Sequence, residues 1–144
     1  MKLKLKKLSP DAVIPRYAHP GDAGLDLCAV EGCVIAPGAR GLVKTGLAIG
    51  LPPGTEAQIR PRSGLAVRNG ISVLNTPGTI DEGYRGEICV LLINFGEAPF
   101  TIEKGMRIAQ MVICPVIRVA IEEVDALGET ARNVDGFGST GMRR

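Results

Sequence analysis

Apolar and polar residues alternate in short stretches along this chain, and turn residues separate one stretch from the next. The alternation at 2–8, 25–30 and 55–60 is typical of strands with one buried face. Nineteen Gly and ten Pro are spread between such stretches, a spacing typical of an all-β sandwich or barrel. Apolar stretches predict further strands at 33–36, 41–51, 71–74, 88–95, 100–103, 106–113 and 116–124.

One segment of the pattern favours a helix instead. Ser63 is able to cap the backbone N–H groups of a following turn. A helix start beside Arg62 also attracts phosphate, although a plain cap is the simpler interpretation. Two glycine signals complete the pattern: Gly46 marks a bulge in a long strand, and Asn69-Gly70 predicts a tight turn into a hairpin.

Length and composition indicate one domain with an aliphatic core. The 144 residues are 45% apolar but only 3% aromatic, so Val, Ile, Leu and Ala have to fill the interior. We expect a single domain over 1–144. Within it, 125–144 forms a linker and a C-terminal arm, because the hydrophobic pattern fades there.

Charge and cysteine usage narrow the range of partners. A net charge of +2 is too small for a strong pull on nucleic acid or anionic lipid. No apolar run approaches the roughly 20 residues that span a bilayer. Four cysteines without a CxxC pair and a single histidine argue against a zinc site. We therefore expect no nucleic-acid or membrane partner and a reducing, cytoplasmic location.

The segment richest in chemical groups lies between two apolar stretches, at 75–87. It carries the carboxylate of Asp81 and the ring of Tyr84 among several glycines. A turn in this place has to lie at the surface, where a ligand can reach it. Since Asp, Glu and Gly also form ordinary turns, the segment alone leaves a binding site and a plain turn equally open.

The C-terminal segment 132–141 is rich in glycine and too polar to fold alone. A disordered tail is one interpretation. A flap that closes over a nucleotide is the other, because its Arg and hydroxyl groups suit phosphate and its Phe ring suits a base. The chain has no GxxxxGKS/T loop, nucleophile elbow or HExxH helix, which leaves Asp81 as the best chemical group.

Five short motifs, taken in order, resemble those of the trimeric dUTPases, the deoxyuridine triphosphate nucleotidohydrolases. A single motif of this kind is weak evidence, but five in the family's order over nearly the whole chain are a specific signature. They are AGLDL at 23–27, PRSGLA at 61–66, GTIDEGYRG at 78–86, RIAQ at 107–110 and GFGSTG at 136–141.

The resemblance implies a jelly-roll-like β fold and a homotrimer, with each active site at a subunit boundary and the flexible arm closing over it. The implied reaction converts dUTP and water to dUMP and pyrophosphate, which lowers dUTP and supplies dUMP for thymidylate synthesis. Asp81 matches the general base for water attack on the α-phosphorus. A carboxylate is a weak base at neutral pH, so water positioning and neutralisation of phosphate charge have to supply most of the rate.

Mg²⁺ is the cofactor that the resemblance implies, held mainly by phosphates and water. Asp26 would contact its hydration shell, although by alternation alone Asp26 is a solvent-facing strand carboxylate. Tyr84 matches the ring that packs on deoxyribose and excludes a 2′-hydroxyl, and Phe137 matches the ring that stacks on uracil. The other implied nucleotide-binding residues contact uracil at Asn75, Gly78, Thr79 and Ile80, and phosphate at Arg62, Ser63, Gly64, Gln110, Arg132, Ser139 and Thr140.

The chain departs from the family pattern at three positions. Asn133 and Asp135 replace arm glycines; both residue types tolerate positive φ, but Asp135 adds negative charge near a triphosphate. Met106 replaces a common Asp. Two other functions stay open: a dCTP deaminase-like enzyme of the same fold, and a catalytically silent regulatory trimer that binds nucleotide.

Overall fold

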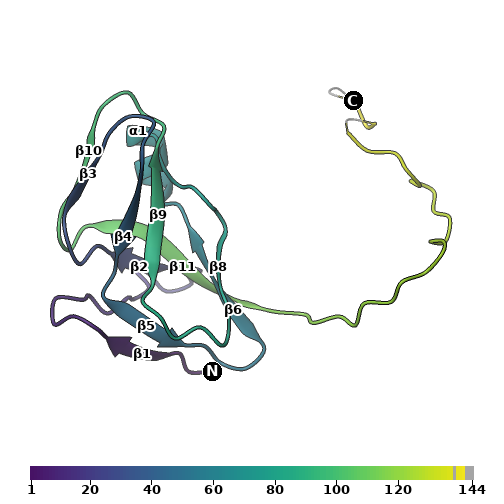
Figure 1. The fold of residues 1–144 in the computed structure, drawn as a ribbon, viewed down its shortest axis with the longest axis horizontal. Helices are drawn as coiled ribbons and strands as arrows, with labels where there is room; N and C mark the ends of the chain where they lie inside the picture. The colour runs from purple at the N-terminus through teal and green to yellow at the C-terminus, as the bar shows by residue number, and fades with distance from the viewer. Residues whose placement is uncertain (138, 142–144) are drawn as a thin grey trace.

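The computed structural model describes residues 1–137 and 139–141, and this part of the chain is almost entirely β-sheet (Figure 1). The prediction of an all-β fold is confirmed. Across the described ranges, no helix has the length and apolarity needed to cross a membrane. The elements in chain order are β1 (Lys4–Lys7), β2 (Leu25–Cys28), β3 (Cys33–Ile35), β4 (Arg40–Lys44), β5 (Leu47–Gly50), β6 (Thr55–Arg60), α1 (Ser63–Asn69), β7 (Ile71–Val73), β8 (Gly78–Ile80), β9 (Cys89–Asn94), β10 (Phe100–Ile102) and β11 (Arg107–Pro115).

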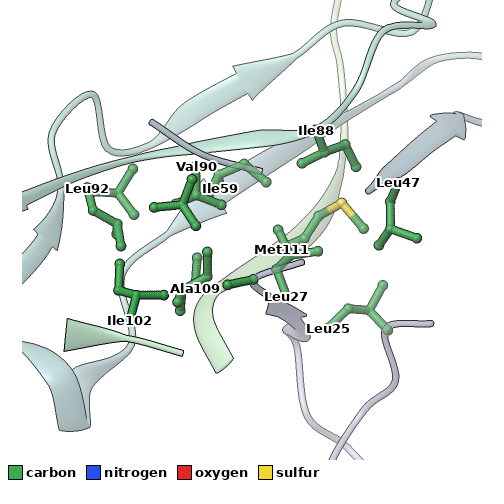
Figure 2. Close-up of a cluster of buried hydrophobic side chains, with 14 of the residues drawn as sticks. Leu25, Leu27, Leu47, Ile59, Ile88, Val90, Leu92, Ile102, Ala109 and Met111 are labelled. Atoms are coloured by element: carbon green, nitrogen blue, oxygen red, sulfur yellow. The ribbon is translucent and has the colours of Figure 1, made fainter. Parts of the chain in front are cut away.

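Two antiparallel sheets enclose the core. The larger has the strand order β2-β11-β6-β8 and the smaller the order β4-β9-β7, while β1-β5 and β10-β3 form two-stranded sheets. Side chains from both larger sheets meet in one cluster, as Figure 2 shows for Ile59 and Met111 opposite Val90 and Leu92. The core is aliphatic almost throughout, as the composition predicted. This arrangement agrees with the jelly-roll-like fold.

Gly46 lies between two strands, where the sequence predicted a bulge within one continuous strand, so that prediction is wrong. The residue adopts φ +68, and 41–51 divides into β4 and β5, which pair in different sheets. An added Cβ at Gly46 would lie 2.9 Å from the Cβ of Ala12. The turn therefore requires glycine both for its backbone angle and for space.

The helix boundaries also differ from the prediction. α1 begins at Ser63, but Arg62 occupies the N-cap position and no side chain caps the helix, so Ser63 is not the cap. Asn69-Gly70 forms the end of the helix, where Gly70 adopts φ +68, and the chain then enters β7. β7 pairs antiparallel with β9, so the predicted hairpin of the stretches 71–74 and 88–95 is present.

The stretch 116–124 is not a strand, which corrects the prediction from its apolar residues. Ile117, Val119 and Ile121 are 89%, 76% and 95% exposed. Figure 1 shows the chain leaving β11 and running away from the sheets. A strand needs partners for its backbone N–H and C=O groups, and within the described part of a single chain only the N–H of Val116 has one, the carbonyl oxygen of Gly54 at 2.9 Å.

Candidate active site

A polar pocket brings together the first, second and fourth motifs. Strand pairing explains why they meet: Gln110 of β11 lies opposite Asp26 of β2 on one side and Arg60 of β6 on the other. The second motif follows directly after β6. The residues that line this pocket, named here the phosphate pocket for its two arginines, are Ala18, His19, Asp22, Ala23, Gly24, Asp26, Arg62, Ser63, Gly64, Arg107 and Gln110.

The amide of Gln110 joins two of these motifs. Its Nε2 donates a hydrogen bond of 2.9 Å to the carbonyl oxygen of Pro61, in the turn after β6. Gly24 packs against the other side of the amide, because an added Cβ there would overlap Gln110 Oε1. The first motif therefore needs glycine at this position for the amide to keep its place.

A β-bulge turns Arg107 toward the phosphate pocket. The register between β11 and β2 shifts between Arg107 and Ala109. Ile108 and Ala109 are consecutive and yet both buried, at 1% and 0% exposed. In a regular strand Arg107 would share the buried face of Ala109, but the extra residue places it on the outer face with Gln110.

Asp26 lies between two arginines in this pocket. Its Oδ1 is 3.3 Å from Arg62 Nε, and its Oδ2 is 3.2 Å from Arg107 Nη1. Arg62 Nη1 also donates to the carbonyl oxygen of Arg107 over 3.2 Å. Asp26 does point away from the core, as its alternation predicts. It is not a free surface carboxylate, however, because its side chain is only 22% exposed and both oxygens are paired.

The thiol of Cys28 lies close enough to Asp26, Arg62 and Arg107 for their charges to change its pKa. Burial raises its pKa above the ordinary 9.0, and the negative charge of Asp26 adds to the rise, while Arg107 and Arg62 act in the opposite direction. A thiol with a raised pKa stays protonated at neutral pH. It is therefore a poor nucleophile and a poor metal ligand.

A second pocket contains the acid and the ring of the third motif, and we call it the Asp81 pocket. Asp81 and Tyr84 are both exposed, as predicted for a segment that a ligand reaches. The segment 75–87 is more than a plain turn, since it contains β8, which pairs with β6. The pocket is lined by Leu42, Thr79, Ile80, Asp81, Tyr84, Glu87, Ile88 and Cys89.

Two glutamates anchor the loop on either side of Tyr84. Glu82 Oε2 accepts a hydrogen bond of 3.0 Å from the backbone N–H of Gly54, and Glu87 Oε1 accepts one of 2.9 Å from that of Gly46. Hydrogen bonds from N–H groups to an ionised carboxylate are among the stronger ones in proteins. The loop that carries the acid and the ring is thus fixed to two separate turns.

The ring of Tyr84 folds back over Gly86. Its hydroxyl donates to the carbonyl oxygen of Glu87 over 3.0 Å. An added Cβ at Gly86 would overlap that hydroxyl, so the third motif needs glycine there. The ring therefore has one defined orientation at the edge of the Asp81 pocket.

The predicted site residues fall into three groups. The phosphate pocket and the Asp81 pocket share no lining residue. Asn75 and Gly78 line neither pocket but lie against each other, since an added Cβ at Gly78 would be 3.0 Å from Asn75 Nδ2. Gly138 of the fifth motif and 142–144 of the predicted arm lie outside the described residues. The remaining arm residues line neither pocket and are exposed: Arg132, Phe137, Ser139 and Thr140.

Three residues with charged or titratable side chains line the phosphate pocket but were not predicted as site residues. Arg107 stands in the fourth motif, but only the bulge brings it to the outer face. His19 and Asp22 lie in the turn before β2; Asp22 Oδ2 accepts the backbone N–H of His19 over 2.8 Å and lies 3.4 Å from its Nδ1. No sequence signal distinguishes a turn residue that lines a pocket from one that does not.

The donor groups do not form a protein-held metal centre. Among residues 1–137 and 139–141, no group of three or more His, Cys, Asp or Glu side chains is arranged to hold a metal ion. Burial raises the pKa of the Cys33 and Cys89 thiols as well, which makes them poor ligands. Two carboxylates, Asp22 and Asp26, line the phosphate pocket.

Together, the fold and the pockets define an all-β, jelly-roll-like protein that presents an arginine pair suited to anions. The dUTPase family model matches residues 11–141. The chain belongs to the dUTPase family. This membership confirms the resemblance carried by the five motifs and the prediction that the protein is an enzyme.

Similar proteins cover nearly the whole chain. A deoxyuridine 5′-triphosphate nucleotidohydrolase of Gloeothece citriformis is 63% identical over 142 residues, which are 99% of this chain and 98% of that protein. The protein of the same name from Clostridium tetani is 61% identical over 139 residues, 96% of each chain. The solved structure of the Staphylococcus bacteriophage 80alpha dUTPase with dUPNHPP superposes with a TM-score of 0.92 at 28% identity, covering 98% of this chain and 99% of that chain.

Proposed function

We propose that this protein is a homotrimeric dUTP diphosphatase that hydrolyses dUTP to dUMP and pyrophosphate. Water attacks the α-phosphorus, and the reaction lowers dUTP and supplies dUMP for thymidylate synthesis in the cytoplasm. The observation that carries the proposal is the assembly of the first, second and fourth motifs around an arginine pair, while the third motif presents an exposed acid and ring in a pocket of its own.

The phosphate pocket suits a triphosphate. Arg62 and Arg107 offer guanidinium donors, which match the geometry of phosphate oxygens. Ser63 and Gly64 line the same pocket at the start of α1, and Gln110 is held in place by its bond to the turn. These groups neutralise and orient the phosphates, which is most of what phosphoryl transfer asks of a protein.

The Asp81 pocket suits the nucleoside and the attacking water. Asp81 is the general base, and Tyr84 lies against the deoxyribose and excludes a 2′-hydroxyl. Asn75 and the backbone of Gly78, Thr79 and Ile80 contact the edge of uracil. The anchored loop and the fixed ring support this assignment, because a positioned base contributes only when its geometry is held.

Mg²⁺ fits this chain as an ion carried by the substrate. The described residues offer no cage of ligands, which agrees with an ion held by phosphates and water. Asp26 would accept hydrogen bonds from its hydration shell, since a carboxylate has more acceptor sites than the two that its arginines occupy. When bound, the ion neutralises charge on the phosphates.

The site is complete only when copies of the chain combine. A single chain keeps the Asp81 pocket apart from the phosphate pocket, since they share no lining residue. The exposed apolar side chains of 116–124 likewise lack a cover within the described part of one chain. A homotrimer brings the phosphate pocket of one subunit to face the Asp81 pocket of another. It also gives the apolar side chains of 116–124 a neighbouring subunit to pack against.

The arm beyond 124 closes over the assembled site in this proposal. Phe137 stacks on uracil, and Arg132, Ser139 and Thr140 contact phosphate. Asn133 adopts φ +43, so this replacement keeps a backbone conformation that glycine would allow. Arg132 Nε donates to the carbonyl oxygen of Asp135 over 2.9 Å, so the side chain that contacts phosphate is engaged within the arm in the free chain.

A pyrophosphate-release assay tests the proposed function. The purified protein, with Mg²⁺, is given dUTP, dCTP, dTTP and UTP in separate reactions, and ammonia is measured in parallel. We expect pyrophosphate from dUTP and at least about a hundredfold lower kcat/KM for the other three, since a hydrogen-bonding pocket rejects mismatched analogues strongly. Ammonia from dCTP would identify a deaminase instead, and nucleotide binding without turnover would identify a silent regulatory trimer.

A further inference from the structure

The phosphate pocket contains an electrostatic conflict. A carboxylate beside the site of a polyanion weakens anion binding by Coulomb repulsion. Asp26 nevertheless lies in this pocket, and only 22% of its side chain is exposed. We therefore look for an interaction of the Asp26 carboxylate that favours anion binding by more than this repulsion weakens it.

The contacts of Asp26 suggest that interaction. Each of its two oxygens pairs with a different arginine, Arg62 at 3.3 Å and Arg107 at 3.2 Å. Two guanidinium groups this close to one carboxylate would otherwise repel each other, and each side chain has many rotamers to lose on binding. Asp26 itself is fixed by the backbone pairing of β2 with β11.

The paired arginines remain available to a ligand. Their side chains are 31% and 56% exposed for Arg62 and Arg107. A guanidinium carries five N–H donors, and the contacts made within the described residues occupy only some of them. Both guanidinium groups are therefore held in one orientation and still have N–H donors free to bind a ligand.

We propose that Asp26 is a positioning residue for phosphate binding, which holds the guanidinium groups of Arg62 and Arg107 in the orientation that receives the phosphates. This inference rests on the proposed function for the nature of the ligand. It assigns Asp26 a role that does not depend on metal, beside its contact with the hydration shell of Mg²⁺.

The direction in which D26N changes the Kd of pyrophosphate distinguishes this positioning role from a role through Mg²⁺ or through charge alone. The Kd of inorganic pyrophosphate is measured calorimetrically for the full-length protein in EDTA, so that no metal contributes. If Asp26 acts only through Mg²⁺ or through its charge, D26N leaves binding unchanged or tightens it. If Asp26 positions the arginines, we expect D26N to weaken binding by about tenfold, which corresponds to about 1.4 kcal/mol.

Two matched variants complete the test. D22N removes a carboxylate that lines the same pocket but pairs with His19 rather than with an arginine, so we expect equal or tighter binding. D26E retains the charge and should recover most of the affinity, to within about threefold of wild type. Unchanged or tighter binding in D26N, or equal weakening in D22N, overturns the proposal.

A measurement on the wild-type protein covers the case in which D26N does not fold. Nitrogen-15 relaxation should show the guanidinium groups of Arg62 and Arg107 to be more ordered than that of Arg40, an exposed arginine that serves as the reference. Equal disorder overturns the proposal. Absence of pyrophosphate release from dUTP by the wild type would instead be the failure of the proposed function, and it is seen in a separate assay.

Discussion

At the scale of single residues, two glycines decide where the polar groups of the pockets lie. Gly24 leaves room for the amide of Gln110, and Gly86 leaves room for the hydroxyl of Tyr84. Neither has a left-handed backbone angle that by itself would require glycine. These glycines therefore serve the placement of neighbouring side chains rather than the path of the chain.

This placement predicts an effect of G86A on sugar selection. The added methyl group displaces the Tyr84 ring, which in our proposal excludes a 2′-hydroxyl. We expect the ratio of kcat/KM for dUTP over UTP to fall by about tenfold or more, as for a lost steric contact of one to three kcal/mol. The matched control is G83A, because a Cβ at Gly83 meets nothing within 4 Å. Equal ratios in the two variants would contradict the assignment of Tyr84.

The proposed role of Asp81 is tested by D81N, which retains the shape of the side chain and removes the proposed general base. We expect kcat to fall by about a hundredfold or more, the usual contribution of a general base. The affinity for a non-hydrolysable dUTP analogue, measured by calorimetry, should change little. A D81N protein that retained most of its turnover would remove Asp81 from the mechanism.

At the scale of elements, β11 and the end of α1 organise the phosphate pocket. β11 pairs with β2 on one side and β6 on the other, so it aligns the first, second and fourth motifs. Gly70 ends α1 with φ +68, and an added Cβ there would lie 2.6 Å from the backbone nitrogen of Gly96. The helix that follows the second motif is therefore fixed at its far end by close backbone packing.

The packing at the helix end predicts that G70A destabilises the fold by more than its backbone angle requires. G38A is the matched control, since Gly38 has a similar φ of +74 but nothing within 4 Å of an added Cβ. We expect about 1 kcal/mol of destabilisation for G38A from the left-handed conformation, and about 2 kcal/mol more for G70A from the clash. Urea unfolding at one protein concentration measures both. Equal losses would show that the contact with Gly96 relaxes freely.

At the scale of the whole molecule, our proposal divides the site between two pockets and an arm. One chain presents the arginine pair in one place and the acid in another, without a shared lining residue. Closed symmetry repeats each surface, so in a ring of identical subunits every boundary can join the two kinds of pocket. The number of complete sites then equals the number of boundaries.

This division predicts complementation between two inactive chains. In our proposal, D81N lacks the base but has an intact phosphate pocket, and R62A lacks a phosphate ligand but has an intact base. If each site takes its two pockets from different subunits, equal random mixing should restore about a quarter of the wild-type rate. Co-refolded mixtures are assayed for pyrophosphate release, with each variant alone as control. Mixtures as inactive as the separate variants would show that both pockets of a site belong to one chain.

The sequence by itself determined the fold class, the aliphatic core and the five motifs, because strand alternation and motif spacing are local properties of the chain. Only the tertiary structure decided that Gly46 separates two sheets, that a bulge turns Arg107 outward and that Asp26 lies between two arginines. Those features depend on register and on contacts between distant segments. The stretch 116–124 shows the same limit. Its apolar, β-branched residues favour a strand, whereas a strand forms only where another backbone completes its hydrogen bonds.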